Sequence, residues 1–167
     1  MASLGHVYVG LAAARLASPK DAKLPLRELC FVFAGLSMLP DADVVSFALG
    51  IPYEAPFGHR GASHSLVVAL FVAAIAWGAT RSLKTGLLVL GTVASHGLLD
   101  TLTDGGCGVA LLWPFSNQRY FAPWNPIPVA PIGLGFLSPR GLACAWTETV
   151  LFAPFWIFAL WPRRRPA

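Results

Sequence analysis

The chain has 167 residues, of which 56% are hydrophobic and only 12% are charged, and its formal net charge is +4. A soluble domain carries about twice that share of charged residues, so the composition excludes a soluble domain and predicts one membrane-embedded domain over residues 1–167. The basic residues lie at the ends of apolar segments and not among aromatic residues, which argues against nucleic acid as a partner.

Five apolar segments follow one another and predict an all-α, polytopic membrane bundle of about five helices. They cover residues 4–17, 25–39 with an extension to 49, 63–80, 85–102 and 140–161. The first would be only about 20 Å long as a helix, so we expect it to be tilted or partly embedded. Ser63 is the expected N-cap of the third segment. An irregular stretch rich in proline and glycine, residues 103–139, separates the fourth segment from the fifth.

The positions of the basic residues predict the orientation. Nine of the twelve lie in the turn between the first two segments, in the turn between the third and fourth, or after the fifth. If every segment crosses, these three places share one side of the membrane, which the positive-inside rule assigns to the cytoplasm. The N-terminus is then outside and the C-terminus is cytoplasmic.

The same topology brings all four histidines and three acidic residues to the outer face. Ionisable groups within membrane segments are costly and usually functional. Imidazole together with carboxylate is the ligand set of zinc, manganese and non-haem iron. The candidate metal ligands are His6, Asp41, Asp43, His59, His64, His96 and Asp100.

Two of these pairs have spacings that suit a shared ion. His96 and Asp100 are four residues apart and therefore share one face of a helix. His59 and His64 lie on either side of a flexible turn. The alternative interpretations are structural: His6 would cap a helix at the interface, and the pair around the turn would be ordinary loop histidines.

Asp41 and Asp43 lie on either side of one residue, at a helix break marked by Pro40. An extended backbone at this break would point both carboxylates the same way, toward a common ion. Alternatively, both would cap a helix or solvate a loop, and Asp41 would be a base or a hydrogen-bond partner of a ligand.

The number of candidates predicts a catalytic cofactor. Seven ligands exceed the needs of one tetrahedral ion, so we expect two Zn²⁺ ions, with Mn²⁺ or Fe²⁺ as alternatives, about 3.5–4 Å apart. Such a pair lowers the pKa of a water molecule and clamps a phosphoryl or acyl oxygen. Asp41, Arg60 and His64 are the expected catalytic residues, with Arg60 pairing with a substrate phosphate. Glu148 within the fifth segment either forms a structural hydrogen bond or lines the substrate cavity.

Three motifs carry a family resemblance. Pro40-Asp41-Ala42-Asp43, the stretch from His59 to Ser65 with the sequence HRGASHS, and the stretch from Ser95 to Asp100 with the sequence SHGLLD follow His6 in this order. The ordered set, over about residues 6 to 105, resembles the YdjM-like inner-membrane metal-dependent hydrolases. That family is distantly similar to zinc-dependent phospholipase C and the S1/P1 nucleases, whose metal clusters use His and Asp on helices. The resemblance implies a helical metallohydrolase of phosphoesters in a bacterial or archaeal cytoplasmic membrane.

The expected function is metal-dependent hydrolysis of a phosphoester in a lipid or lipid-linked substrate. A site at the outer hydrocarbon boundary meets lipid head groups laterally, which favours such a substrate among the membrane lipids. One alternative is a metal-binding transporter, but a transporter shows ligands at several depths and repeated halves. Another is a structural metal site in a membrane adaptor, but closed zinc sites usually include cysteine, and no CxxC spacing is present.

Overall fold

The computed structural model describes residues 4–17, 22–131 and 133–162, and these residues form helices joined by turns and two long loops. The α-helices are α1 (Leu4–Leu16), α3 (Leu26–Met38), α4 (Val45–Ala48), α5 (Leu66–Thr80), α6 (Leu83–Thr101), α7 (Pro139–Leu151) and α8 (Ala153–Leu160). Three 3₁₀ helices complete the set: η1 (Leu39–Val44), η2 (Ala62–His64) and η3 (Gly133–Leu137). Over the described residues, β-structure is limited to two isolated bridges, so the all-α prediction is confirmed.

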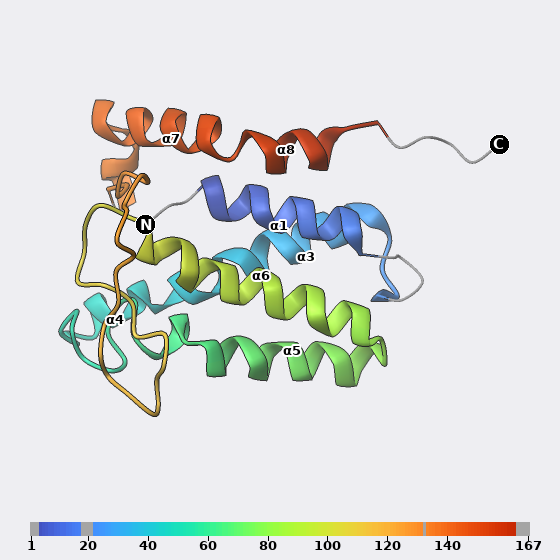
Figure 1. The fold of residues 1–167 in the computed structure, drawn as a ribbon, viewed down its shortest axis with the longest axis horizontal. Helices are drawn as coiled ribbons and strands as arrows, with labels where there is room; N and C mark the ends of the chain where they lie inside the picture. The colour runs from blue at the N-terminus through green and yellow to red at the C-terminus, as the bar shows by residue number, and fades with distance from the viewer. Residues whose placement is uncertain (1–3, 18–21, 132, 163–167) are drawn as a thin grey trace.

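The long helices run side by side in alternating directions (Figure 1). Helix α1 contacts α3, α6 and α8, and α5 packs along α6. Gly10 permits the close approach of α1 to α3, because a Cβ there would lie 2.5 Å from the carbonyl oxygen of Phe33. Figure 1 shows the two long loops and the start of α1 at one end of the bundle, and the turn between α5 and α6 at the other.

Large apolar side chains cover much of the outer surface of the bundle. Phe31, Phe71 and Trp146 are each at least 65% exposed, on three different helices. Within the described residues, one continuous stretch, Leu26–Ala48, is long and apolar enough to cross a membrane alone. Helices α7 and α8 would make a second crossing if their 68° bend lies within one span. The structure therefore establishes helices with apolar surfaces, and the number of crossings stays a prediction.

Two local predictions at segment starts and breaks are wrong. The N-cap of α5 is Ser65 and not Ser63, because the Ser65 hydroxyl accepts the N–H of Val68 while the Ser63 hydroxyl points to Asp43. The backbone after Pro40 is not extended but continues as the 3₁₀ helix η1. Proline is tolerated at the first turn of a helix, where its missing N–H has no partner to lose.

The predicted fifth helix is divided into α7 and α8 at Phe152. Pro154 has no N–H to donate to the carbonyl of Val150, so the helix ladder stops there and the axis bends. The loop over residues 103–131 and the loop over residues 49–61 lie at the same end of the bundle (Figure 1). Arg119 fixes the first of these loops to the second by donating to the carbonyl oxygens of Tyr53 (2.9 Å) and His59 (3.1 Å).

Candidate metal centre

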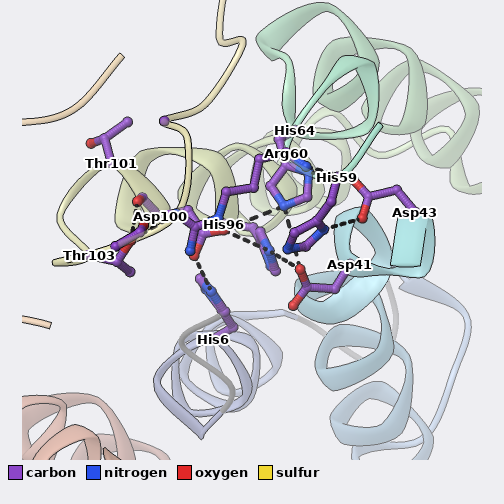
Figure 2. Close-up of polar contacts among 12 residues, drawn as sticks. His6, Asp41, Asp43, His59, Arg60, His64, His96, Asp100, Thr101 and Thr103 are labelled. Carbon is purple, nitrogen blue, oxygen red and sulfur yellow. Dashed lines mark hydrogen bonds and ion pairs between the residues drawn. The ribbon is translucent and has the colours of Figure 1, made fainter. Parts of the chain in front are cut away.

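The seven candidate ligands lie together at one end of the bundle, although they come from four separate parts of the chain (Figure 2). They are supplied by α1 (His6), η1 (Asp41 and Asp43), the segment of residues 59–64 that ends in η2 (His59 and His64) and α6 (His96 and Asp100). Gly97 allows α6 to touch this segment, since a Cβ there would lie 2.4 Å from the carbonyl oxygen of His64.

Four of these residues converge on one point and form what we call the inner group: Asp41, His64, His96 and Asp100. Their facing atoms are an imidazole nitrogen or a carboxylate oxygen, and all lie within 4.8 Å of one another. All four side chains are buried. The facing atoms form no hydrogen bond of acceptable geometry to any described residue, and among them Asp100 Oδ2 also forms an ion pair with Arg60 Nε at 2.9 Å. Buried polar atoms without hydrogen bonds are rare and costly, so their convergence makes this point a candidate cation site.

The spacing within the inner group suits metal ligands. His64 Nε2 lies 3.5 Å from an oxygen of Asp41 and 3.5 Å from an oxygen of Asp100. His96 Nε2 lies 3.4 Å and 3.9 Å from the same two oxygens. Ligands held 2.0–2.1 Å from a tetrahedral ion are about 3.3–3.4 Å from each other, so the observed edges need little contraction to enclose one ion.

Formal charge gives a second reason to expect a cation. The cluster buries or half-buries the carboxylates of Asp41, Asp43 and Asp100 against one guanidinium, that of Arg60. With neutral histidines the sum is −2, and burial of uncompensated charge costs several kcal/mol per ion. One divalent cation would make the site neutral.

The two histidines of the inner group are held with Nε2 toward the centre. His96 Nδ1 lies 2.6 Å from the carbonyl oxygen of Ser37, and because a carbonyl only accepts, Nδ1 carries the proton. In the neutral ring, Nε2 of His96 is then the atom with the lone pair, and it faces the inner group. His64 Nδ1 lies 3.1 Å from a carboxylate oxygen of Asp43, which orients that ring in the same way.

Asp43, His59 and His64 form a second cluster, the outer group, which could also hold an ion. Here, however, the distances are those of hydrogen bonds: His59 Nδ1 lies 2.6 Å from one oxygen of Asp43. The other oxygen accepts the N–H of Arg60 at 3.0 Å and the hydroxyl of Ser63. The outer group therefore resembles the hydrogen-bonded support that commonly lies behind a metal-bound histidine.

The 3₁₀ helix η1 explains why the two carboxylates separate. With three residues per turn, side chains two positions apart diverge by about 120° instead of pointing the same way. Asp41 reaches the Nε2 side of the His64 ring and Asp43 reaches the Nδ1 side. The structure thus brings both aspartates to one imidazole, but from opposite edges.

Arg60 is fully buried beside the inner group, with a left-handed backbone (φ 59°) that is uncommon for a residue with a side chain. Its Nε lies 2.9 Å from Asp100, and its Nη1 donates to the Thr103 hydroxyl and the Gly105 carbonyl oxygen, both at 2.9 Å. Its Nη2 has no hydrogen-bond partner among the described residues. Arg60 therefore fixes Asp100 and keeps one donor for a further acceptor.

His6 lies next to the inner group without belonging to it. Its ring stacks on His96 with centroids 3.7 Å apart, and its Nε2 lies 3.4 Å from Oδ1 of Asp100, the oxygen that faces away from His64. Glu148 supports this position, because its carboxylate accepts the N–H of Gly5 at the start of α1. Glu148 was expected either to form a structural hydrogen bond or to line the substrate cavity, and the structure favours the hydrogen bond.

The protonation of His64 depends on the carboxylates around it. Burial lowers the pKa of this imidazole, but the nearby carboxylates of Asp100, Asp41 and Asp43 outweigh burial and raise its pKa to about 10. Without a metal ion the ring is therefore protonated at neutral pH, and a proton there replaces part of the missing positive charge.

Sequence reasoning did not identify three supporting groups: the Ser37 carbonyl, Ser63 and Thr103. The carbonyl carries no signal in sequence, because any residue would supply it. Ser63 lies inside the motif between two histidines, and Thr103 lies three residues beyond Asp100, one helical turn on. The sequence could have indicated both residues through a hydroxyl one or three positions from a candidate ligand.

The comparisons with known proteins agree with the motifs. The profile of the family described as "YdjM inner membrane protein" matches residues 1–165, well beyond the motif region. The Inner membrane protein YbcI of Escherichia coli (strain K12) is 41% identical over 150 residues, covering 80% of this chain and 84% of that protein. No solved structure matches the chain significantly. The chain belongs to the YdjM family of inner membrane proteins.

Proposed function

We propose that this protein is a membrane-embedded, metal-dependent phosphoesterase acting on a lipid or lipid-linked substrate. The observation that carries the proposal is the convergence of four buried ligand side chains beside Nη2 of Arg60, which has no hydrogen-bond partner among the described residues. A cation site alone requires only the four ligands. A buried guanidinium donor at its edge adds a place for a phosphoryl oxygen, because guanidinium groups pair well with phosphate.

The residues of the site have distinct roles in this proposal. A divalent ion held by the inner group would polarise the phosphoryl oxygen and lower the pKa of a water molecule. Arg60 Nη2 donates to a second phosphoryl oxygen. The water oxygen bonds to phosphorus while the ester P–O bond breaks. The water proton goes to the free Oδ2 of Asp41, and the departing alkoxide takes a proton from solvent.

The ligand set bears on which metal is bound. Four protein ligands close the coordination sphere of tetrahedral zinc, whereas a six-coordinate ion such as Mn²⁺ keeps two positions for water and substrate. Asp100 offers one oxygen to the inner group and the other to His6, so it is the residue that would bridge to a second ion. We propose one ion in the inner group and place any second ion between Asp100 and His6.

The site lies at the end of the bundle opposite the turn between α5 and α6 (Figure 1). We propose that the helices lie along the membrane normal in a multi-pass arrangement, with the basic turns cytoplasmic and the site at the outer face. The apolar outer surfaces of α3, α5 and α7 support this placement.

The test measures metal content and turnover in the same samples. Purified full-length protein in detergent micelles is analysed for stoichiometric metal and assayed with bis(p-nitrophenyl) phosphate plus Mn²⁺ or Zn²⁺. His96→Gln should lose the metal and the turnover, and Asp41→Asn should lose turnover at least 100-fold. Asp104→Asn is the matched control, because Asp104 lies at the same end but accepts the N–H of Val129 outside the site. Native protein without metal would overturn the proposal.

A structural metal site is the second candidate, favoured by the same four-ligand completeness. A structural site would bind the same metal as the proposed enzyme but would not hydrolyse phosphoesters. Stoichiometric metal that stabilises the fold, together with no turnover of phosphoesters by the native protein, would select this candidate over the enzyme.

A further inference from the structure

An apolar groove of about 390 Å³ runs along the bundle where α1 lies between α6 and α8. The walls come from one face of each of three helices: Val9, Ala12, Ala13 and Leu16 on α1, Leu87, Leu88, Gly91 and Thr92 on α6, and Pro154, Phe155 and Phe158 on α8. The one hydroxyl among them, that of Thr92, donates to the carbonyl oxygen of Leu88 within its own helix, so it needs no ligand. The groove therefore offers hydrocarbon contacts alone.

The groove ends one helical turn from the metal centre. Val9 follows His6 by three residues on α1, and Thr92 precedes His96 by four on α6, so they lie about 4.5 Å and about 6 Å along their helices from a site histidine. The rings of His6 and His96 stack on each other at this junction. From there the groove extends about 10 Å along α1, the rise from Val9 to Leu16, toward the opposite end of the bundle.

We propose that this groove holds the hydrocarbon chain of the lipid whose phosphoester is hydrolysed at the metal centre. The proposal rests on the proposed function and narrows the substrate to esters with a long alkyl, acyl or isoprenoid chain. Three observations support this occupant: a wall in which the one hydroxyl is already bonded, an end one helical turn from the stacked rings of His6 and His96, and membership of a family of inner membrane proteins. A polar head group would find no hydrogen-bond partner along the walls.

Gly91 provides a way to block the groove without disturbing the helix packing. It lines the groove, it is exposed, and an added Cβ would meet nothing within 4 Å. Gly78 on α5 is a matched control, because it is also an exposed helical glycine with nothing within 4 Å but lies outside the groove. Gly91→Leu and Gly78→Leu add the same apolar side chain and the same gain in helix propensity.

The first measurement compares two chromogenic diesters with the same reacting phosphorus, hexadecyl p-nitrophenyl phosphate and ethyl p-nitrophenyl phosphate. Native full-length protein in detergent micelles with Mn²⁺ should favour the hexadecyl ester by about 10-fold or more in kcat/KM, because the groove buries part of its chain. Gly91→Leu should lower this hexadecyl-to-ethyl ratio several-fold, and Gly78→Leu should leave the ratio at the native value.

Turnover of both esters with no chain-length preference, or an equal ratio in the two glycine variants, would overturn the groove assignment and leave the phosphoesterase standing. Turnover of neither ester would instead overturn the proposed function and, with it, the assignment of the chain to a substrate. The two failures are therefore distinguishable.

A second measurement does not depend on turnover. The protein is placed in vesicles that contain a phosphatidylglycerol with a diazirine in its acyl chain, irradiated, and the labelled residues are mapped by mass spectrometry. Val9 and Phe155 should be labelled, and Gly91→Leu should reduce this labelling several-fold while Gly78→Leu does not. Labelling that is equal in both variants would show only the general lipid surface and would overturn the groove assignment.

Discussion

The two nitrogens of the His64 ring face two clusters of histidine and aspartate that differ in their hydrogen bonding. At Nε2, the imidazole nitrogens and carboxylate oxygens of the inner group lie 3.4–3.9 Å from each other and form no hydrogen bonds of acceptable geometry. At Nδ1, the outer group has contacts of 2.5–3.1 Å, and Asp43 accepts from the backbone, a hydroxyl and both imidazoles.

The difference shows that ligand-type residues alone do not identify a metal site. Atoms at hydrogen-bond distance already have partners and gain little from an ion, whereas atoms about one tetrahedral edge apart leave room for one. The sequence joins the two groups through a single imidazole. In the proposed metal centre, Asp43 would act on the ion through His64, and Asp41 would act on it directly. The following predictions separate these two roles.

The largest expected effect is that of His96→Gln on the inner group. The variant removes a nitrogen ligand whose orientation is fixed by the carbonyl of Ser37. Replacing a residue that only hydrogen-bonds to a ligand lowers metal affinity by up to about 100-fold, so losing the ligand itself should lower the affinity for Zn²⁺ by more than about 100-fold. Competition with a chelating dye on the purified protein measures this. An affinity equal to that of Asp104→Asn would mean that the metal lies elsewhere.

Asp43→Asn should have a smaller effect on the same titration. The amide keeps the shape of the side chain but accepts less strongly from His64, so we expect a loss of about 10- to 100-fold in affinity. The number of bound ions should not change. A loss of one ion out of two in this variant would instead make Asp43 a ligand and the outer group a second metal site.

The charge argument predicts a pH dependence for the metal-free protein. The pKa of His64 is raised from an ordinary value of 6.5 to about 10, so its protonated form contributes stability that is complete below pH 6.5 and is lost as the pH rises through 10. After chelation, the melting temperature should fall by several degrees between pH 7 and pH 10. Metal-loaded protein should not show this fall, because the ion replaces the proton. Equal pH profiles in the two forms would contradict the role of His64 as a ligand.

The helices of this fold could be predicted from sequence because apolar runs and polar turns mark them directly. The predicted segments 4–17 and 85–102 differ from α1 and α6 by no more than two residues at either end. The break at Phe152 was missed, since an apolar run continues through Pro154. The number of membrane crossings could not be decided by length alone, because α1, α5 and α7 are 13, 15 and 13 residues long, shorter than a membrane span.

The sequence was enough to predict which residues form the candidate site, but not how their side chains are directed. His96 and Asp100 share a face because they are four apart on a helix, and this follows from sequence. The opposite directions of Asp41 and Asp43 depend on a 3₁₀ turn, which a local pattern does not distinguish from an extended one. The contact of Arg60 with Asp100 is set by a loop that Arg119 holds through backbone carbonyls, and such tertiary contacts leave no local pattern.

The smallest expected effect separates the stability of α5 from the metal centre. Ser65 follows His64 directly, but its hydroxyl caps α5 by accepting the N–H of Val68 at 3.2 Å and is no part of either group. Ser65→Ala should lower the free energy of unfolding by about 1 kcal/mol through loss of the cap. The affinity for Zn²⁺ should stay within about twofold of native, because the contacts of both nitrogens of His64 are unchanged. A drop as large as that of Asp43→Asn would mean that the cap positions His64, and the outer group would then extend into the first turn of α5.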